Sequence, residues 1–310
     1  MPILWVVDFI DICSRLPMKK WTRRKVIVNG FRGAVVLGAG KGFYNTTPLH
    51  IDLVGKEIKI DGLPESFRGL KIAQLSDLHA STIVSNSLFE KAAQLVKSKK
   101  PDLIFLTGDY VSGATRFLSG HVGEFNKRHL DECIDSLARL EAPLGIYGVL
   151  GNHDFWSGEE AVKTIMRVFT KSLKVKWLRN ESVTIEKGSD SLDLLGVDDY
   201  WAPSCSLGKA YKGLDSRSVK ILLSHNPDIN EEIELLGKRI DLVMSGHTHG
   251  GQVVVPLIGQ PVIPSKYGQK YRAGLVRDGG RQTYISRGIG HLLVPLRINC
   301  PPEVTILTLV

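Results

Sequence analysis

Between residues 48 and 250 the chain repeats one pattern, in which a short apolar run ends in a polar cluster and a segment with helical spacing follows. The runs lie in LKIAQLSDLH, PDLIFLTGDY, LGIYGVLGNHD, VKILLSHNPD and IDLVMSGHTH. Near-continuous apolar runs of this length are typical of strands that are buried on both faces, in sheets covered by helices. The pattern therefore predicts five such strands.

The segments between these runs carry apolar residues at the spacing of amphipathic helices. The positions are Leu88, Ala92, Leu95 and Val96, then Leu130, Ile134, Leu137 and Leu140, then Ile229, Ile233 and Leu236. The first group follows Ser85-Asn86-Ser87, which offers candidates for a helix N-cap. Strand–helix alternation predicts an α/β sheet, whose ligand site lies beyond the carboxyl ends of the strands. All five polar clusters stand at such ends.

After residue 250 the chain changes to short β-rich pieces punctuated by Gly and Pro, among them GQVVVPLIGQPVI, RQTYISRGIG and EVTILTLV. Partial alternation of apolar and polar residues in these pieces is typical of strands. They predict a second sheet packed on the first, so that residues 49–310 form one domain.

Composition limits the class of protein. A chain of 310 residues with 43% hydrophobic content can bury a large core. The net charge is +8, of which residues 1–44 carry +6 (eight Lys/Arg against Asp8 and Asp11), leaving +2 for the rest. A nucleic-acid binder would spread a basic footprint over the folded part, so no nucleic-acid partner is expected. The four cysteines form no CxxC pair, which argues against a zinc framework or a disulfide scaffold.

Residues 1–48 are predicted to form a basic, partly apolar signal or membrane-associating segment. A cluster from Lys19 to Lys25 precedes a mostly apolar stretch, Val26 to Tyr44, which Asn29 and two basic residues interrupt. It is either a twin-arginine export signal led by Arg23-Arg24 or a retained segment at an anionic membrane surface, where each Lys/Arg contributes about 1 kcal/mol. No A-x-A-like cleavage site is present, which favours retention. Within the stretch, GAGKG fits neither nucleotide-binding fingerprint, so no nucleotide cofactor is expected.

The polar clusters supply two carboxylates, one amide oxygen and four imidazoles. They belong to Asp77, His79, Asp109, Asn152, His225, His247 and His249. This is too many ligands for one tetrahedral zinc ion, and it suits two divalent ions that share a carboxylate. The mixed donors are acceptable to Mn, Fe, Zn or Co, of which we expect Mn. We expect His247 and His249 to face the ions because alternate residues of an extended chain share a side, with Gly250 and Gly251 letting the backbone turn away.

The ordered set Asp77-x-His79, Gly108-Asp109, Gly151-Asn152-His153-Asp154, Ser224-His225 and Gly246-His247-Thr248-His249 resembles the calcineurin-like metallophosphoesterases over roughly residues 70–250. The resemblance implies a four-layer αββα sandwich. It also implies that Asp77, His79, Asp109 and His249 hold one ion. Asp109 as a bridge, with Asn152, His225 and His247, would hold the other.

Two residues of the GNHD motif are left for catalysis. His153 would protonate the leaving group or stabilise the oxyanion, since Asn152 takes the metal. Asp154 would either orient His153 or cap the loop. Near the C-terminus Arg297 and Asn299 could bind phosphate or sugar, but the pattern favours a surface or second-sheet role.

The motifs HNPD, GHTHGGQ and INCPPEVTILTLV are similar to those of the bacterial branch with a twin-arginine or membrane segment. That resemblance implies peripheral association with the bacterial inner membrane, on its cytoplasmic face or after export, and an amphiphilic nucleotide-lipid substrate. The best candidate reaction converts UDP-2,3-diacylglucosamine to UMP and 2,3-diacylglucosamine 1-phosphate. The alternatives are a broad-specificity phosphodiesterase without lipid preference and, from another class, a metal-stabilised interaction scaffold.

A helical pattern after GNHD bears on the membrane expectation. Ile165, Phe169 and Leu173 share a face near basic residues, as in helices that lie on lipid. The pattern favours packing of this helix on the chain's own sheet.

Overall fold

The computed structural model describes residues 50–113, 125–255, 259–292 and 296–310. The N-terminal segment expected over residues 1–48, with its basic cluster and GAGKG stretch, lies outside them. Within the described part, no helix is both long and apolar enough to cross a membrane.

Two mixed six-stranded sheets form the centre of the folded unit. The first has the order β1 (Asp52–Ile58), β12 (Glu303–Leu309), β2 (Lys71–Leu75), β3 (Leu103–Leu106), β4 (Ile146–Gly148) and β5 (Lys176–Trp177). The second has the order β10 (Gly274–Asp278), β11 (Arg281–Ile285), β9 (Leu242–Ser245), β8 (Lys220–Leu223), β7 (Asp190–Gly196) and β6 (Glu181–Lys187). Neighbouring strands are parallel, except for β12 with β2, β10 with β11, and β6 with β7.

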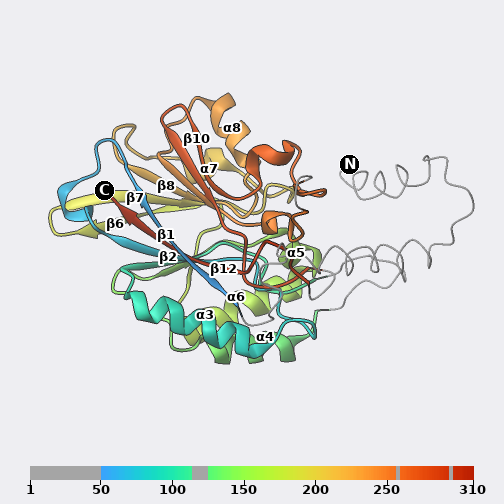
Figure 1. Ribbon diagram of the computed structural model, residues 1–310. Helices are drawn as coiled ribbons and strands as arrows, with labels where there is room; N and C mark the ends of the chain where they lie inside the picture. The colour runs from blue at the N-terminus through green and yellow to red at the C-terminus, as the bar shows by residue number, and fades with distance from the viewer. Residues whose placement is uncertain (1–49, 114–124, 256–258, 293–295) are drawn as a thin grey trace, which may run out of the picture. The chain divides into compact units, whose positions relative to one another are not determined.

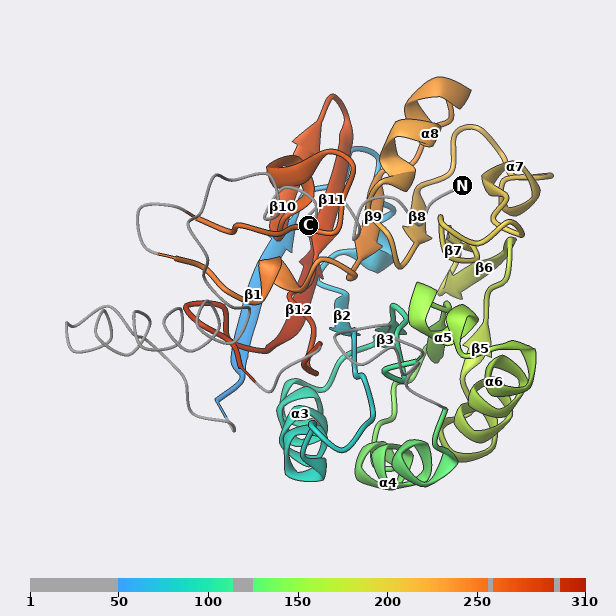
Figure 2. The same cartoon turned by 90° about the vertical axis from the view of Figure 1, so that its right-hand side faces the viewer.

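Helices cover the outer face of each sheet, which gives the four-layer α/β sandwich. The described helices of more than one turn are α3 (Asn86–Lys99), α4 (Lys127–Leu137), α5 (Asn152–Trp156), α6 (Glu159–Leu173), α7 (Leu207–Ala210) and α8 (Ile229–Leu236). Short 3-10 turns lie at Glu65–Phe67, His249–Gly251 and Gly268–Tyr271. Figures 1 and 2 both show α3 and α4 on one outer face and α8 on the opposite one.

The buried side chains sort into three clusters, one for each interface between layers. Alternate residues of β3 show the division: Ile104 and Leu106 pack with α3, α4 and α6, whereas Leu103 and Phe105 face the second sheet. In the second sheet, Leu222 packs with α8 in the third cluster. Because strand side chains alternate between faces, a sheet buried on both faces needs the near-continuous apolar runs seen in the sequence.

The five predicted strands are confirmed as β2, β3, β4, β8 and β9, and the three predicted helices as α3, α4 and α8. Packing of the segment after GNHD on its own sheet is also confirmed, since Ile165, Phe169 and Leu173 of α6 are buried in the first cluster. That apolar face is therefore not available to a membrane.

The expected composition of the second sheet is wrong in part. Only β10 and β11 come from the region after residue 250, while β8 and β9 from the repeated pattern also belong to that sheet. The last strand, β12, lies instead in the first sheet between β1 and β2. Its side chains fit there because Val304 and Ile306 face one core and Leu307 and Leu309 the other.

Candidate metal centre

The polar clusters beyond five strand ends converge at the carboxyl edges of the two sheets. Strands β2, β3 and β4 lead to Asp77 and His79, Asp109, and Asn152, while β8 and β9 lead to His225, His247 and His249. These side chains are at most 4% exposed. Burying so many polar groups is costly unless each has a partner, so the cluster calls for a ligand.

One group of donors consists of Asp77, His79 and His249, whose ligand atoms lie within 4.8 Å of one another. Nε2 of His79 lies 2.9 Å from Nε2 of His249, and the latter is 3.4 Å from Oδ1 of Asp77. The two imidazoles and the carboxylate therefore point at one position.

A second group consists of Asp109, His225 and His247. Oδ2 of Asp109 is 3.1 Å from Nε2 of His225, which is 3.2 Å from Nδ1 of His247. The same Oδ2 is 3.5 Å from Nε2 of His79 in the first group. Asp109 thus lies between the groups, where a ligand shared by two ions would stand.

Buried polar atoms without a hydrogen-bond partner show whether these residues fit metal ions. Among the described residues, Nδ1 of His79, Oδ1 of Asn152 and Nε2 of His247 are buried and have no hydrogen-bond partner. Each such atom costs about 1–3 kcal/mol if it stays unpaired. Oδ1 of Asn152 can act as an electron-pair donor to a divalent ion, as can one ring nitrogen of each neutral imidazole, and imidazole, amide and carboxylate form the mixed set that first-row divalent metals accept. The residues fit two divalent ions.

Electrostatics is consistent with metal binding, which requires neutral imidazoles. Burial lowers the pKa of His79 to about 3 and that of His247 to about 3. His225 differs: burial opposes its charge, yet the Asp109 carboxylate raises the pKa of His225 to about 10. Burial also raises the pKa of Asp77 to about 6.

The backbone at the ligands is left-handed, which corrects the expected extended geometry of His247 and His249. The φ values are 72° at His247 and 51° at His249, and they are 52°, 48° and 56° at Asp77, His79 and Asp109. Such conformations are unfavourable for residues with a Cβ and persist at functional sites where tertiary contacts impose them. One such contact joins the sheets, because the backbone N–H of His247 donates to Oδ1 of Asp77 at 3.0 Å.

The glycines after His249 behave as expected. Gly250 and Gly251 have φ values of 59° and 79°. A Cβ on Gly250 would lie 2.7 Å from Sγ of Cys300. The chain can therefore turn here only because both positions lack side chains.

The GNHD segment forms the start of α5 and places His153 beside the ligands. The His153 ring is edge-on to that of His79, with 4.9 Å between centroids, and its backbone N–H donates to Oδ1 of Asp109 at 2.9 Å. Its Nδ1 lies 2.6 Å from the carbonyl oxygen of Ser112, which fixes the ring and leaves Nε2 for another partner. His153 can also form a donor group with His79 and Asp109.

Asp154 caps the loop, which is one of the two roles that the sequence left open. Its carboxylate accepts backbone N–H groups from Gly151 at 2.8 Å and from Asp109 and Tyr110 at 2.9 Å. The partner of the His153 ring is the Ser112 carbonyl instead. Asp154 therefore fixes the backbone that carries Asp109 and Asn152.

Arg297 is buried and bound within the protein. Its Nη2 donates to the carbonyl oxygens of Gly290 at 2.6 Å and Arg287 at 2.8 Å, and it lies 3.1 Å from Nδ1 of His249. Asn299 donates to the carbonyl oxygen of Val254 at 3.1 Å. Arg297 is thus neither on the surface nor in a strand of the second sheet, which differs from the role that the sequence favoured.

Asp199 is a site residue that the sequence reasoning missed. It is fully buried at the end of β7, and burial raises its pKa to about 7. Oδ1 accepts the backbone N–H of Trp201 at 2.8 Å, while Oδ2 has no partner in the described structure. The signal was present, because LDLLGVDDY is another apolar run that ends in carboxylates.

The chain is similar in sequence to known metallophosphoesterases. The family model described as "Calcineurin-like phosphoesterase" matches residues 70–251. The "Uncharacterized metallophosphoesterase YkuE" of Bacillus subtilis (strain 168) is 30% identical, over 94% of this chain and 99% of its own length. The "Phosphodiesterase YaeI" of Escherichia coli (strain K12) is 37% identical, over 77% of this chain and 82% of its own. A "Transmembrane protein with metallophosphoesterase domain" of Danio rerio is 27% identical, over 82% of this chain and 56% of its own.

Proposed function

The chain belongs to the calcineurin-like phosphoesterase family and is a metal-dependent phosphoesterase, and on that premise we propose that it hydrolyses a phosphodiester or pyrophosphate bond of an amphiphilic substrate at a membrane. The best candidate reaction converts UDP-2,3-diacylglucosamine to UMP and 2,3-diacylglucosamine 1-phosphate, a step of lipid A synthesis. The observation that carries the phosphoester chemistry is the pair of donor groups on either side of Asp109.

Two divalent ions, Mn²⁺ in our proposal, would be held by Asp77, His79 and His249 on one side and by Asn152, His225 and His247 on the other, with Asp109 between them. When bound, such ions neutralise phosphate oxygens and lower the pKa of water enough for attack on phosphorus. The protein contributes imidazoles, a shared carboxylate and a backbone that fixes both.

His153 acts on the substrate side in this proposal. With Nδ1 held by the Ser112 carbonyl, Nε2 is the atom that can exchange a proton with the leaving oxygen or donate to a phosphate oxygen. Burial lowers the pKa of His153, while the nearby Asp109 carboxylate acts in the opposite direction. An anionic phosphate beside the ring would likewise favour its protonated form.

The membrane part of the proposal rests on the charge of residues 1–44 and on relatives. That segment carries +6 of the chain's +8 and would be attracted to anionic lipid. Its attachment would be peripheral at the bacterial inner membrane, on the cytoplasmic face or after twin-arginine export. The Danio rerio relative is named a transmembrane protein, which supports a membrane setting for this domain.

A broad-specificity phosphodiesterase without lipid preference is the second candidate, favoured by the name of the Escherichia coli relative. The two are separated by comparing kcat/KM for UDP-2,3-diacylglucosamine in detergent with that for its deacylated analogue. A preference for the acylated substrate supports the lipid proposal. Equal values leave the broad phosphodiesterase, and turnover of bis-p-nitrophenyl phosphate with manganese provides the control for an active preparation.

A further inference from the structure

Two tryptophans join the candidate metal centre to the surface. The Trp201 ring is edge-on to that of His247, with centroids 4.5 Å apart. The Trp156 ring lies 4.9 Å from that of His153. The two indoles are nearly parallel to each other, at 17°, with centroids 6.0 Å apart. They form a continuous aromatic surface from a metal-ligand candidate to the proposed proton donor.

Hydrogen bonds fix the main chain at both tryptophans. The N–H of Trp201 donates to the buried carboxylate of Asp199 at 2.8 Å. Trp156 ends α5, a helix whose first turn is fixed through Asp154, and Oγ of Ser157 donates to the carbonyl oxygen of His153 at 2.8 Å. Each indole also packs against a histidine ring and against the other indole, and a surface ordered in this way loses little conformational entropy when a ligand covers it.

Despite this support, the indole of Trp156 remains accessible. Trp156 is 48% exposed, and Trp201 is half-buried. Exposed single apolar residues are common on proteins, but here two stacked indoles stand next to buried catalytic groups. Flat aromatic faces of this kind bind other planar rings by stacking.

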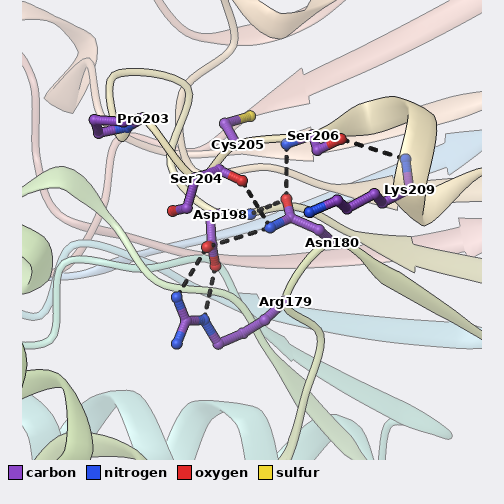
Figure 3. A pocket seen from close by; sticks show the side chains of 8 residues that line it. All are labelled: Arg179, Asn180, Asp198, Pro203, Ser204, Cys205, Ser206 and Lys209. Atoms are coloured by element: carbon purple, nitrogen blue, oxygen red, sulfur yellow. Dashed lines mark hydrogen bonds and ion pairs between the residues drawn. The ribbon is translucent and has the colours of Figure 1, made fainter.

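A polar pocket of about 630 Å³ is lined in part by the loop that carries Trp201, and Figure 3 shows its eight lining residues. Its lining comes from the loop that carries Trp201 (Asp198, Pro203, Ser204, Cys205, Ser206), from Arg179 and Asn180, and from Lys209. Arg179 brings the pocket close to α5, because its guanidinium lies 5.6 Å from the ring centroid of Phe155 in that helix. Arg179 also donates to both carboxylate oxygens of Asp198, at 2.8 and 2.9 Å.

We propose that Trp156 and Trp201 form a stacking platform for a nucleobase on the phosphoester substrate, with the polar pocket receiving the hydrogen-bonding edge of the base or its sugar. This inference deepens the proposed function, on which it rests, by giving the nucleotide half of the substrate its own binding site. An acyl chain is the poorer occupant of the same place. It would need an apolar groove beyond the tryptophans, whereas the pocket there is lined mainly by charged, amide and hydroxyl side chains.

The experiment measures binding to the manganese-loaded full chain by calorimetry, with UMP and ribose 5-phosphate as probes. Both probes carry a phosphomonoester on ribose, but only UMP carries a base. Wild type should bind UMP more tightly than ribose 5-phosphate. Trp156→Leu and Trp201→Leu should each weaken UMP binding roughly 5- to 150-fold, the equivalent of the ~1–3 kcal/mol that base stacking on one aromatic contributes. Ribose 5-phosphate should change less than about threefold, and Trp→Phe variants should keep most of the UMP preference.

Leu235→Ala is the matched control, since Leu235 is an apolar residue of α8 that is 87% exposed; it should leave both affinities unchanged. Equal binding of the two probes to wild type would overturn the proposal. So would an equal loss of both in the tryptophan variants, because that pattern means the indoles only support His153 and His247. Decyl phosphate serves as a probe for an acyl chain. If it bound more tightly than ribose 5-phosphate, lost that advantage in the tryptophan variants, and UMP showed no preference, the surface would bind an acyl chain and the proposal would be overturned. If wild type bound UMP more tightly than ribose 5-phosphate but did not hydrolyse UDP-2,3-diacylglucosamine, the proposed substrate would be refuted and the stacking platform would not.

Discussion

Replacing Asp154 by Asn tests whether this carboxylate builds the metal centre or takes part in the chemistry. Its Oδ2 accepts the N–H groups of Asp109 and Gly151 at 2.9 and 2.8 Å, and its Oδ1 accepts those of Tyr110 at 2.9 Å and Val111 at 3.4 Å. Asn keeps one oxygen and turns the other into an NH₂ donor that faces two N–H groups. Burial raises the pKa of Asp154 to about 8, so above that pH at least two hydrogen bonds to a charged group are lost.

Each hydrogen bond to a charged group contributes about 1.5–3 kcal/mol, so the variant should lose ~3–6 kcal/mol of unfolding free energy. Unfolding free energies are commonly about 5–15 kcal/mol, which makes this loss a large fraction of the total. At about 2–4 °C per kcal/mol, the thermal midpoint should fall by roughly 6–24 °C.

Circular dichroism during heating, with and without chelator, measures the midpoint, and elemental analysis gives the metal content. Asp190→Asn is the matched control. Asp190 accepts the N–H of Ser66 at 2.9 Å in a part-buried setting, and a surface change of this kind should cost less than about 1 kcal/mol. If Asp154→Asn melted within 2 °C of wild type and bound metal normally, yet lost turnover at least 100-fold, the structural assignment would be wrong and a catalytic one right.

Three further outcomes follow from the site. Turnover should require added Mn²⁺, Co²⁺ or a similar ion and cease with chelator; undiminished turnover by protein shown to be metal-free would refute the two-ion site. Asp109→Ala should lower the metal content, because it removes the ligand that the two ions would share. His153→Ala should keep both ions but lower kcat roughly 10²–10⁴-fold, the usual range for a general acid–base group; an emptied metal position in that variant would instead make His153 a ligand.

The sequence could predict the strands because a strand buried on both faces of a sheet has to be apolar along its length. The polar cluster that follows each apolar run then marks the end of the strand. β3, for example, has no polar residue between Leu103 and Leu106, and Asp109 follows shortly after its end. The seven ligand candidates could be found in the same way, since parallel strands bring their carboxyl ends to one edge. Asp199 follows a run of the same kind, but its role depends on Trp201, which shows no signal of its own in the sequence.

The local backbone at the site could not be predicted, because long-range contacts impose it. His247 adopts φ 72° while its N–H bonds to Asp77, 170 residues earlier in the chain. The position of β12 is equally non-local, since Leu307 pairs with Ile72 across most of the folded unit. An alternating strand pattern says which face is apolar, but not which neighbour covers it.

The burial of α6 bears on the proposed membrane attachment. Its apolar face, Ile165 with Phe169 and Leu173, is in the core, so this face cannot bind lipid as an interfacial helix does. Residues 1–44, with their charge of +6, are then the candidate anchor. Removing them should shift the protein from the membrane fraction to the soluble fraction. It should leave kcat/KM for bis-p-nitrophenyl phosphate within about threefold, because none of the ligand candidates lies in that segment. If the truncated protein stayed on membranes, or the intact protein were wholly soluble without processing, the anchor would not lie in this segment.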